Sequence, residues 1–90
     1  MVESNRYTII VDDKQVYLDT WVYHELDFSD CGIPDDIHAL QFRNGSGWIE
    51  YRDTRPNPPL NSVADFPDWA VKCIAKWEEQ YIKNPPPETV

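Results

Sequence analysis

Three groups of side chains in this sequence could in principle catalyse a reaction or bind a metal. Cys31 and His38 could act as a nucleophile and its base, because a histidine that removes the proton activates a thiol. The adjacent carboxyl groups of Asp35 and Asp36 could share acid–base work. The segment 27–32 contains two aspartates and a serine before a glycine, which gives it a passing likeness to a calcium loop.

None of the three groups has the pattern that its chemistry requires. No motif surrounds Cys31 and His38, and a histidine beside an apolar residue in a strand is more often a hydrogen-bonded structural residue. Nothing near Asp35 and Asp36 explains the raised pKa of a general acid. The segment 27–32 lacks the ligand spacing and closing glutamate of an EF-hand. With no zinc pattern and no glycine-rich phosphate loop either, we predict a protein that is not an enzyme and has no cofactor or metal.

The excess negative charge is concentrated in the first half of the chain. The formal net charge is −8. Residues 1–42 hold nine carboxylates and two cations, whereas residues 43–90 hold seven carboxylates and six cations. No lysine or arginine lies between Lys14 and Arg43. This distribution argues against direct binding to nucleic acid or an anionic membrane, and it permits a basic protein partner. Solubility alone would also explain it.

The length and hydropathy of the chain limit the class of protein. Ninety residues suit one domain, which we place at residues 1–84, followed by a flexible proline-rich tail at 85–90. No stretch approaches the ~20 apolar residues that a membrane span needs. Residues 1–20 lack the apolar core of a signal peptide, so we expect a reducing cytoplasm and two free cysteines.

Three strand-like segments are predicted before residue 27. Residues 6–12, 15–18 and 21–26 are rich in β-branched and aromatic side chains. The tight turns Asp12–Lys14 and Asp19–Thr20 separate them. This arrangement is typical of an antiparallel meander.

The strongest local signal is a hairpin that follows an acidic loop. Residues 27–36 are rich in turn-forming types and are predicted to form the loop. Residues 37–43 and 48–53 read as strands, and the intervening Asn44–Gly47 supplies the positive φ angles of a hairpin turn. Strict alternation would divide the first strand into two faces, with His38, Leu40 and Phe42 on one and Ile37, Ala39 and Gln41 on the other.

The remainder of the chain is predicted to form a linker and one amphipathic helix. Prolines exclude a helix or a central strand at 54–63. The helix is expected to start near Asp65–Pro67, with Asp65 as its cap, and to stop at Lys83–Asn84 before three prolines. Its apolar stripe would consist of Phe66, Ala70, Cys73, Ile74, Trp77 and Tyr81. The predicted fold is α+β: four or five short antiparallel strands in a meander, with one C-terminal helix packed on one face.

Two features of the sequence could form a protein-binding surface. One is the aromatic hairpin and the other is the acidic stretch that precedes it, because aromatic rings are favoured interface anchors. A small core built from few, large side chains would also explain the many aromatic residues. An edge strand could pair with another protein or with a second copy of the chain. The candidate contact residues are Asp27, Asp30, Asp35, Asp36, Phe42, Trp48 and Tyr51.

Several segments resemble a set of small proteins of tailed bacteriophages and prophages. The matching segments are Ile37–Phe42, Gly45–Tyr51, Arg55–Asn57, Phe66–Ala70 and Trp77–Glu78. In that set an I-H-A-L-Q-W strand leads to a glycine hairpin, W-I-E-Y/F, a P-N linker and a P-D-W helix. This chain differs at Phe42, where tryptophan is common, and by extra residues around Cys31.

The resemblance implies a phage or prophage origin, with the host bacterial cytoplasm or the virion as the location. Such genes often lie near tail or tail-fibre genes, so it implies a minor tail-associated structural or assembly protein that binds a phage tail protein. It carries over no catalytic residue. The acidic stretch suggests an alternative: an early phage inhibitor of a basic host protein, directed at a defence factor or the polymerase, whose carboxylates mimic nucleic-acid phosphates.

Overall fold

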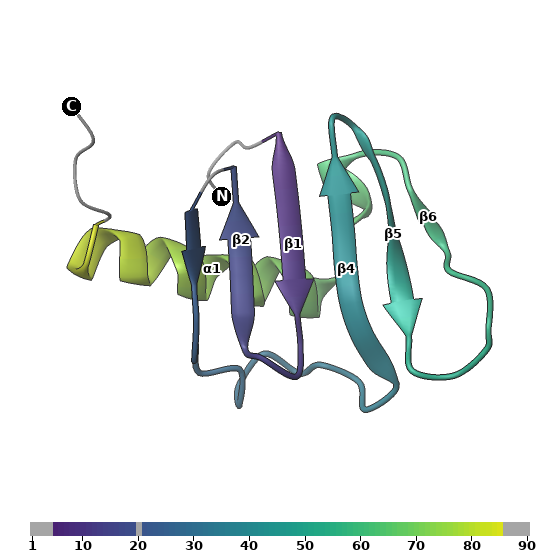
Figure 1. Cartoon of the computed structure of the whole chain (residues 1–90), viewed down its shortest axis with the longest axis horizontal. Helices are drawn as coiled ribbons and strands as arrows, with labels where there is room; N and C mark the ends of the chain where they lie inside the picture. Colours follow the sequence, from purple (N-terminus) through teal and green to yellow (C-terminus); the bar gives the residue numbers. More distant parts are fainter. Residues whose placement is uncertain (1–4, 20, 86–90) are drawn as a thin grey trace.

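The computed structural model describes residues 5–19 and 21–85, and shows a six-stranded antiparallel sheet with one helix across one face (Figure 1). The elements are β1 (Arg6–Ile10), β2 (Gln15–Leu18), β3 (Trp21–Tyr23), β4 (Ile37–Arg43), β5 (Ser46–Tyr51), β6 (Pro59–Leu60), the 3-10 helix η1 (Val63–Asp65) and α1 (Asp68–Lys83). The predicted tail beyond Pro85, and Thr20 of the second predicted turn, lie outside the described ranges. None of the helices in these ranges is long and apolar enough to cross a membrane.

The sheet consists of two three-stranded meanders joined by a long connection. Its order is β3-β2-β1-β4-β5-β6, so consecutive strands are neighbours except at β3 and β4. The connection at residues 24–36 runs past one end of the sheet and brings β4 beside β1 (Figure 1). The predicted α+β fold is confirmed. The sheet has one strand more than the upper number expected, because the proline-containing segment contributes the short edge strand β6.

The hairpin between β4 and β5 turns on two residues. Asn44 and Gly45 have φ angles of 52° and 83°, and Arg43 and Ser46 pair across the turn. Positive φ at both central residues is the geometry that matches the twist of the flanking strands, and Asn-Gly adopts it readily. The hairpin was therefore predicted correctly, although its second strand begins at Ser46 rather than Trp48.

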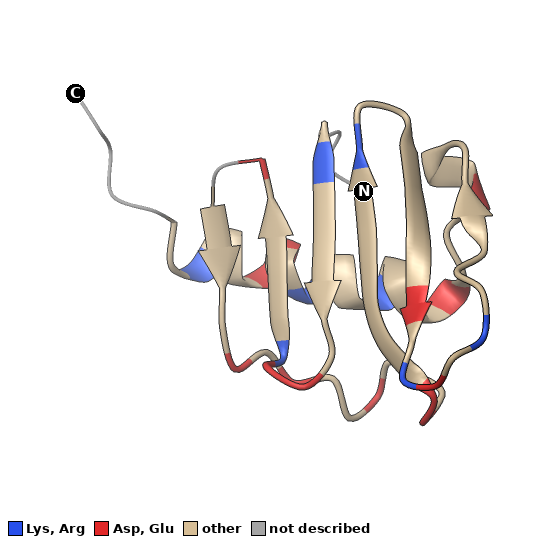
Figure 2. Ribbon diagram, turned by 45° about the vertical axis from the view of Figure 1, so that its right-hand side comes forward, with Lys and Arg blue, Asp and Glu red and all other residues tan. Residues whose placement is uncertain are grey.

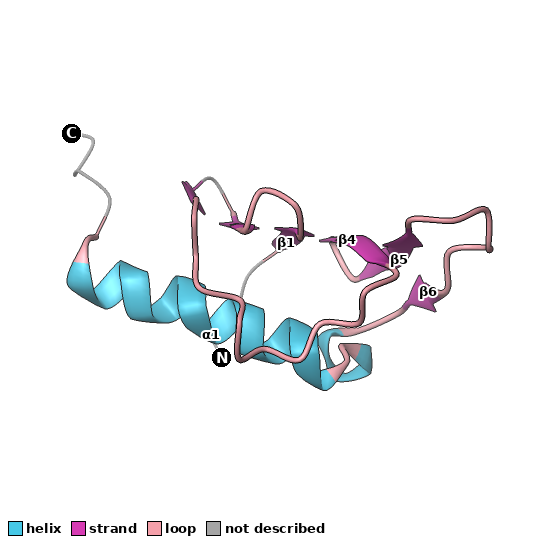
Figure 3. Cartoon of the chain, turned by 90° about the horizontal axis from the view of Figure 1, so that it is seen from below, coloured by secondary structure: helices cyan, strands magenta, loops and turns pink. Residues whose placement is uncertain are grey.

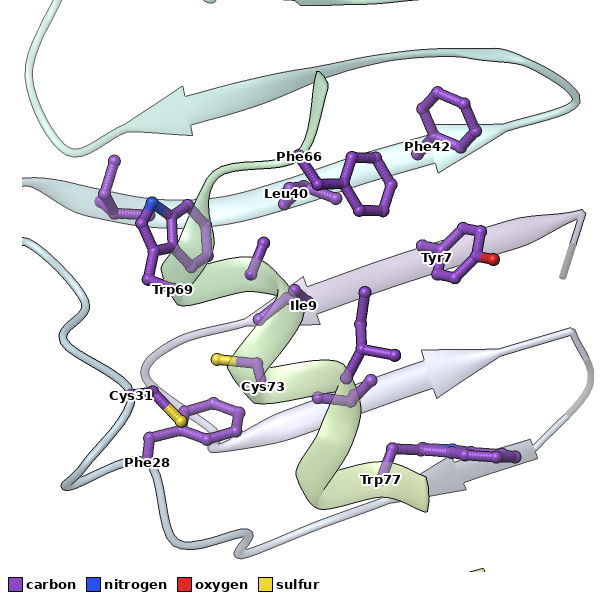
Figure 4. Packing of buried hydrophobic residues seen from close by; sticks show 14 of the residues in the cluster. Tyr7, Ile9, Phe28, Cys31, Leu40, Phe42, Phe66, Trp69, Cys73 and Trp77 are labelled. Carbon is purple, nitrogen blue, oxygen red and sulfur yellow. The ribbon is translucent and has the colours of Figure 1, made fainter. Parts of the chain in front are cut away.

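The core lies between α1 and one face of the sheet (Figures 3 and 4). On β1, alternate residues Tyr7 and Ile9 point into it, and Leu40 and Phe42 do so on β4. The helix contributes its buried residues Trp69, Ala70, Cys73, Ile74 and Trp77. The stripe predicted from the sequence was therefore largely correct, but it omitted Trp69 and included Tyr81, whose side chain is exposed.

Strict alternation fails at one point in β4. The register with β5 shifts between Ile37 and Ala39, as in a β-bulge. The extra residue turns Ile37 toward the core, where it is buried on the same side as Leu40 and Phe42. The expectation that Ile37 lies on the opposite face from Phe42 is therefore wrong.

The helix begins later than the sequence suggested. Asp68 is its first residue, and the preceding Pro67 forms no side-chain cap. The Asp65 carboxylate instead accepts a hydrogen bond from the Ser62 backbone N–H (3.2 Å) and completes the capping box of η1. Asp65 therefore stabilises the short turn before the helix rather than the helix itself.

The 24–36 connection also contributes to the core. Leu26, Phe28 and Cys31 are buried, and Cys31 lies near Cys73 of the helix (Figure 4). Both cysteines are free thiols, and burial raises the pKa of each. This direction is opposite to the one that activates a cysteine nucleophile. His38 lies elsewhere, with its Nδ1 3.7 Å from an Asp12 carboxylate oxygen.

Candidate protein-binding surfaces

The face of the sheet opposite α1 is not covered by any helix or strand of the described chain (Figure 3). Cross-strand pairing aligns one row of side chains over the whole sheet: Val22, Tyr17, Thr8, Gln41, Trp48 and Pro59. At the centre of the row the Thr8 hydroxyl donates a hydrogen bond to Gln41 Oε1 (3.0 Å). We call this surface the open face. The polar residues Thr8 and Gln41 at the centre of the open face lie between the larger side chains of Tyr17 and Trp48.

Trp48 is the largest exposed apolar side chain of the open face, with 43% of its surface accessible. Its indole N–H donates a hydrogen bond to Glu50 Oε2 (2.8 Å), which holds the ring in one orientation. A tryptophan that is already oriented loses little conformational freedom when a partner covers it. The open face therefore presents one preorganised aromatic anchor.

The three predicted aromatic contact residues separate in the structure. Only Trp48 lies on the open face. Phe42 is 4% exposed, and its ring makes edge contacts with Tyr7 and Phe66 at centroid distances of 6.0 and 5.1 Å. Tyr51 is half-buried against the core, with the Arg55 guanidinium 4.1 Å from its ring centroid. Phe42 is thus a core residue, which corrects the expectation that its ring is presented to a partner.

The predicted acidic contact residues do gather in space, at one end of the strands (Figure 2). Asp27, Asp30, Asp35 and Asp36 lie in the 24–36 connection. Asp12 of the β1–β2 turn and Asp53, which follows β5, lie at the same end of the sheet. We call this group the acidic end. It combines loops that are far apart in the sequence.

Cations from the second half of the chain neutralise much of the acidic end. Arg52 forms a bidentate ion pair with Asp12, in which its two terminal nitrogens lie 2.6 and 3.0 Å from the two carboxylate oxygens. Arg55 lies 2.8 Å from a carboxylate oxygen of Asp36 and 2.6 Å from one of Asp53. A further pair joins Lys76 to Asp30 (3.0 Å). The acidic end is therefore less negative than the sequence of residues 1–42 suggests.

Two of the predicted acidic residues have carboxylates that form no ion pair with a described cation. Asp27 accepts hydrogen bonds from the Ser29 backbone N–H (3.0 Å) and hydroxyl (2.6 Å), which lower its pKa. Asp35 is exposed, and its backbone carbonyl accepts a hydrogen bond from Arg52 Nε (3.1 Å). Asp27 and Asp35 are the carboxylates of this group that a basic partner would reach most directly.

Hydrogen bonds from arginine lower the pKa of two carboxyl groups at the acidic end. Arg55 lowers the pKa of Asp53 to about 2, and Arg52 lowers that of Asp12. Both groups are therefore ionised at neutral pH. A general acid requires the opposite shift.

Replacing Arg55 by glutamine is expected to raise the pKa of Asp53 from about 2 toward its ordinary value of 3.8. In the wild type, the pKa of Asp53 is lower in the folded state than in the unfolded state. The Arg55–Asp53 interaction therefore stabilises the fold fully above the unfolded-state pKa, and this stabilisation is lost as the pH falls through about 2. Carboxyl carbon NMR titration measures the change. Asp27 is the internal control, since hydrogen bonds from Ser29 are the main cause of its lowered pKa. An unaltered Asp53 titration in the variant would show that Arg55 is not the cause.

The two edges of the sheet differ from the long, flat edges that readily pair with other chains. β6 has two residues, one of them Pro59, and β3 has three. The helix extends past β3 (Figures 1 and 3), and the Tyr23 hydroxyl donates a hydrogen bond to the Asn84 carbonyl (2.5 Å). Short edges blunted by proline limit pairing with another chain. Dimerisation through an edge strand stays a prediction.

Comparison with known proteins does not assign a function to these surfaces. No family profile, curated protein or solved structure matches the chain. Within residues 5–19 and 21–85, no three His, Cys, Asp or Glu side chains are grouped so that they could hold a metal ion. The two candidate surfaces are the open face and the acidic end.

Proposed function

We propose that this chain is a non-enzymatic protein of a tailed bacteriophage or prophage, and that it binds another protein as a minor tail-associated structural or assembly component. The observation that carries the binding role is the uncovered sheet face with its oriented, 43% exposed Trp48. Tryptophan is among the residues that contribute most to protein interfaces. The phage and tail assignments rest on the sequence resemblance described above.

The acidic end supports an alternative function, the inhibition of a basic host protein by mimicry of nucleic-acid phosphates. Its carboxylates gather on one side of the molecule, as such mimicry requires (Figure 2). Four of them, however, pair with Arg52, Arg55 or Lys76. Asp27 and Asp35 are left as the residues on which this alternative depends. We therefore rank it second.

Capture of partners from infected cells tests the proposed function. The tagged full chain is purified from the bacterium during phage production, and captured proteins are identified by mass spectrometry. We expect a tail protein among them, and we expect the chain in purified virions. Trp48→Ala should reduce this capture about 30-fold, because truncation of an interface anchor costs about 2 kcal/mol or more.

The control is Trp21→Ala, which also removes a tryptophan ring. Trp21 lies on the edge strand β3 and pairs with the core residue Leu18, so its side chain is on the helix side of the sheet and not on the open face. We expect this variant to retain capture. Capture of a basic host protein in place of a tail protein would favour the alternative function. The alternative replaces the tail function if the double variant Asp27→Asn/Asp35→Asn no longer binds that host protein and Trp48→Ala still binds it.

A further inference from the structure

The two cysteines of the chain meet inside the fold although they are remote in the sequence (Figure 4). Cys31 belongs to the 24–36 connection and Cys73 to α1, and their sulfurs point toward each other. Cys31 is 2% exposed and Cys73 is 0% exposed. Both are free thiols, and each is a hydrogen-bond partner of the other. The fold therefore encloses a pair of thiols between a connection and a helix.

Side chains, rather than the backbone, attach this part of the connection to α1. Within the described ranges, the one backbone-to-backbone hydrogen bond of residues 27–33 is local, and it joins the Cys31 N–H to the Phe28 carbonyl (3.1 Å). The ion pair of Asp30 with Lys76 (3.0 Å) reaches the helix, but the Asp30 side chain is 68% exposed, and exposed ion pairs contribute little to stability. Segments with few hydrogen bonds open locally at less cost than global unfolding. Residues 27–33 can therefore move away from α1 while the sheet stays intact.

The surroundings of the two thiols decide which of them reacts first when the connection opens. Burial is the main cause that raises the pKa of both thiols, so neither is reactive in the closed fold. The contact between them lowers the pKa of Cys31 and raises that of Cys73. Because the thiolate is the nucleophile, Cys31 is the first to attack an oxidant.

We propose that Cys31 and Cys73 are an oxidisable pair, which low-molecular-weight disulfides such as oxidised glutathione convert into an intrachain disulfide bond. The Cys31 thiolate attacks one sulfur of oxidised glutathione and forms a mixed disulfide. The glutathione thiolate that leaves takes up the proton that Cys31 lost. Cys73 then loses its proton, attacks the Cys31 sulfur and releases the second glutathione as a thiol. Two protein thiols are thereby oxidised, and one glutathione disulfide is reduced to two thiols.

The disulfide fixes the 24–36 connection to α1. It adds a covalent bond where the closed fold has side-chain contacts and an exposed ion pair, and it closes a loop of about 40 residues, which restricts the unfolded chain. A reducing cytoplasm keeps the pair as thiols, and oxidising surroundings favour the bond. Since the connection carries Asp27 and Asp35, oxidation also holds part of the acidic end in place. The inference does not depend on the proposed function, which partner capture tests separately.

Incubation of the purified full chain with oxidised glutathione at about pH 8 tests the inference. We expect both free thiols to disappear, the mass to fall by about 2 Da, and a tryptic digest to contain a peptide pair that joins Cys31 to Cys73. Amide NMR shifts should change mainly in residues 27–33 and in the turns of α1 around Cys73. The unfolding midpoint should rise by about 5–15 °C and return to its starting value after reduction. Cys31→Ala, which has one thiol, should show no rise after the same treatment.

Asp30→Asn should speed disulfide formation about two- to fivefold, because it removes both the ion pair with Lys76 and a negative charge that raises the pKa of Cys31. The matched control is Glu25→Gln, which removes an exposed carboxylate from the same connection and should leave the rate within about 1.5-fold of the wild type.

Several results would overturn the inference. These are retention of both thiols after prolonged exposure, arrest at the mixed disulfide with glutathione, and a disulfide between two copies of the chain. An intrachain disulfide that lowers the unfolding midpoint, or equal rates in Asp30→Asn and Glu25→Gln, would also contradict it. Capture of a tail protein would stand independently of these results.

Discussion

Replacement of Phe42 by alanine is expected to lower the free energy of unfolding by about 3–5 kcal/mol. The ring is 4% exposed and lies between Tyr7 of the sheet and Phe66 of the segment that leads into the helix. Its removal deletes two edge-to-face contacts and leaves a cavity where the sheet meets that segment. Small domains are stable by only about 5–15 kcal/mol, so the variant should lose a large part of its stability.

Urea denaturation monitored by circular dichroism measures this loss, and Trp48→Ala on the same hairpin is the matched control. Its ring is 43% exposed on the opposite side of the sheet, so we expect a cost of about 1 kcal/mol or less. Similar costs for the two substitutions would contradict the assignment of Phe42 to the core and Trp48 to the open face. The comparison also keeps a stability effect apart from a binding effect when partner capture is measured.

Replacement of Gly47 by alanine should cost about 3 kcal/mol or more. A Cβ atom at this position would lie 2.0 Å from the carbonyl oxygen of Gln41 and 2.6 Å from the Cα of Phe42. Both are backbone atoms of the paired strand β4, which cannot move aside without disrupting its pairing with β5. Gly47 is therefore required for the close approach of the two strands rather than for the turn.

Gly45→Ala is the control within the same hairpin. Gly45 has a φ angle of 83°, and a Cβ there would meet nothing within 4 Å. Its substitution should cost about 1–2 kcal/mol, because an L-residue adopts the left-handed conformation at this energy. Urea denaturation gives both values, and amide hydrogen exchange shows whether the β4–β5 hydrogen bonds weaken. A smaller cost at Gly47 than at Gly45 would contradict the close packing of the two strands.

These two predictions bear on the proposed binding surface as well as on the fold. Gly47 immediately precedes Trp48, and β4 places Arg43 beside the turn. A hairpin whose strands move apart would displace both Trp48, the aromatic anchor of the open face, and Arg43. Loss of partner capture in Gly47→Ala would therefore follow from the displaced surface, whereas loss in Trp48→Ala would follow from the missing ring.

Much of the secondary structure could be predicted from local sequence because local interactions determine it. Alternating apolar residues and an Asn-Gly turn specify the hairpin, and a stripe at helical spacing specifies α1. The bulge near Ile37 could not be predicted in this way, because it depends on how β4 pairs with β5. The capping role of Asp65 is local, since Ser62 and Asp65 have the spacing of a capping box, but the apolar stripe alone did not separate η1 from α1.

The sequence by itself predicted most of the elements and the clustering of acidic residues before Arg43, and it placed Trp48 among the candidate contact residues. Only the tertiary structure decided how the charges are arranged. The pairing of β1 with β4 brings Arg6 and Arg43 together, and the folding of the C-terminal half back onto the 24–36 connection brings Arg55 and Lys76 to its carboxylates. These contacts join residues that are remote in the chain, and they exist because the two meanders share one sheet and one helix covers it. The acidic stretch in the sequence thus becomes a partly neutralised surface, and Arg6 and Arg43 lie at the other end of the sheet.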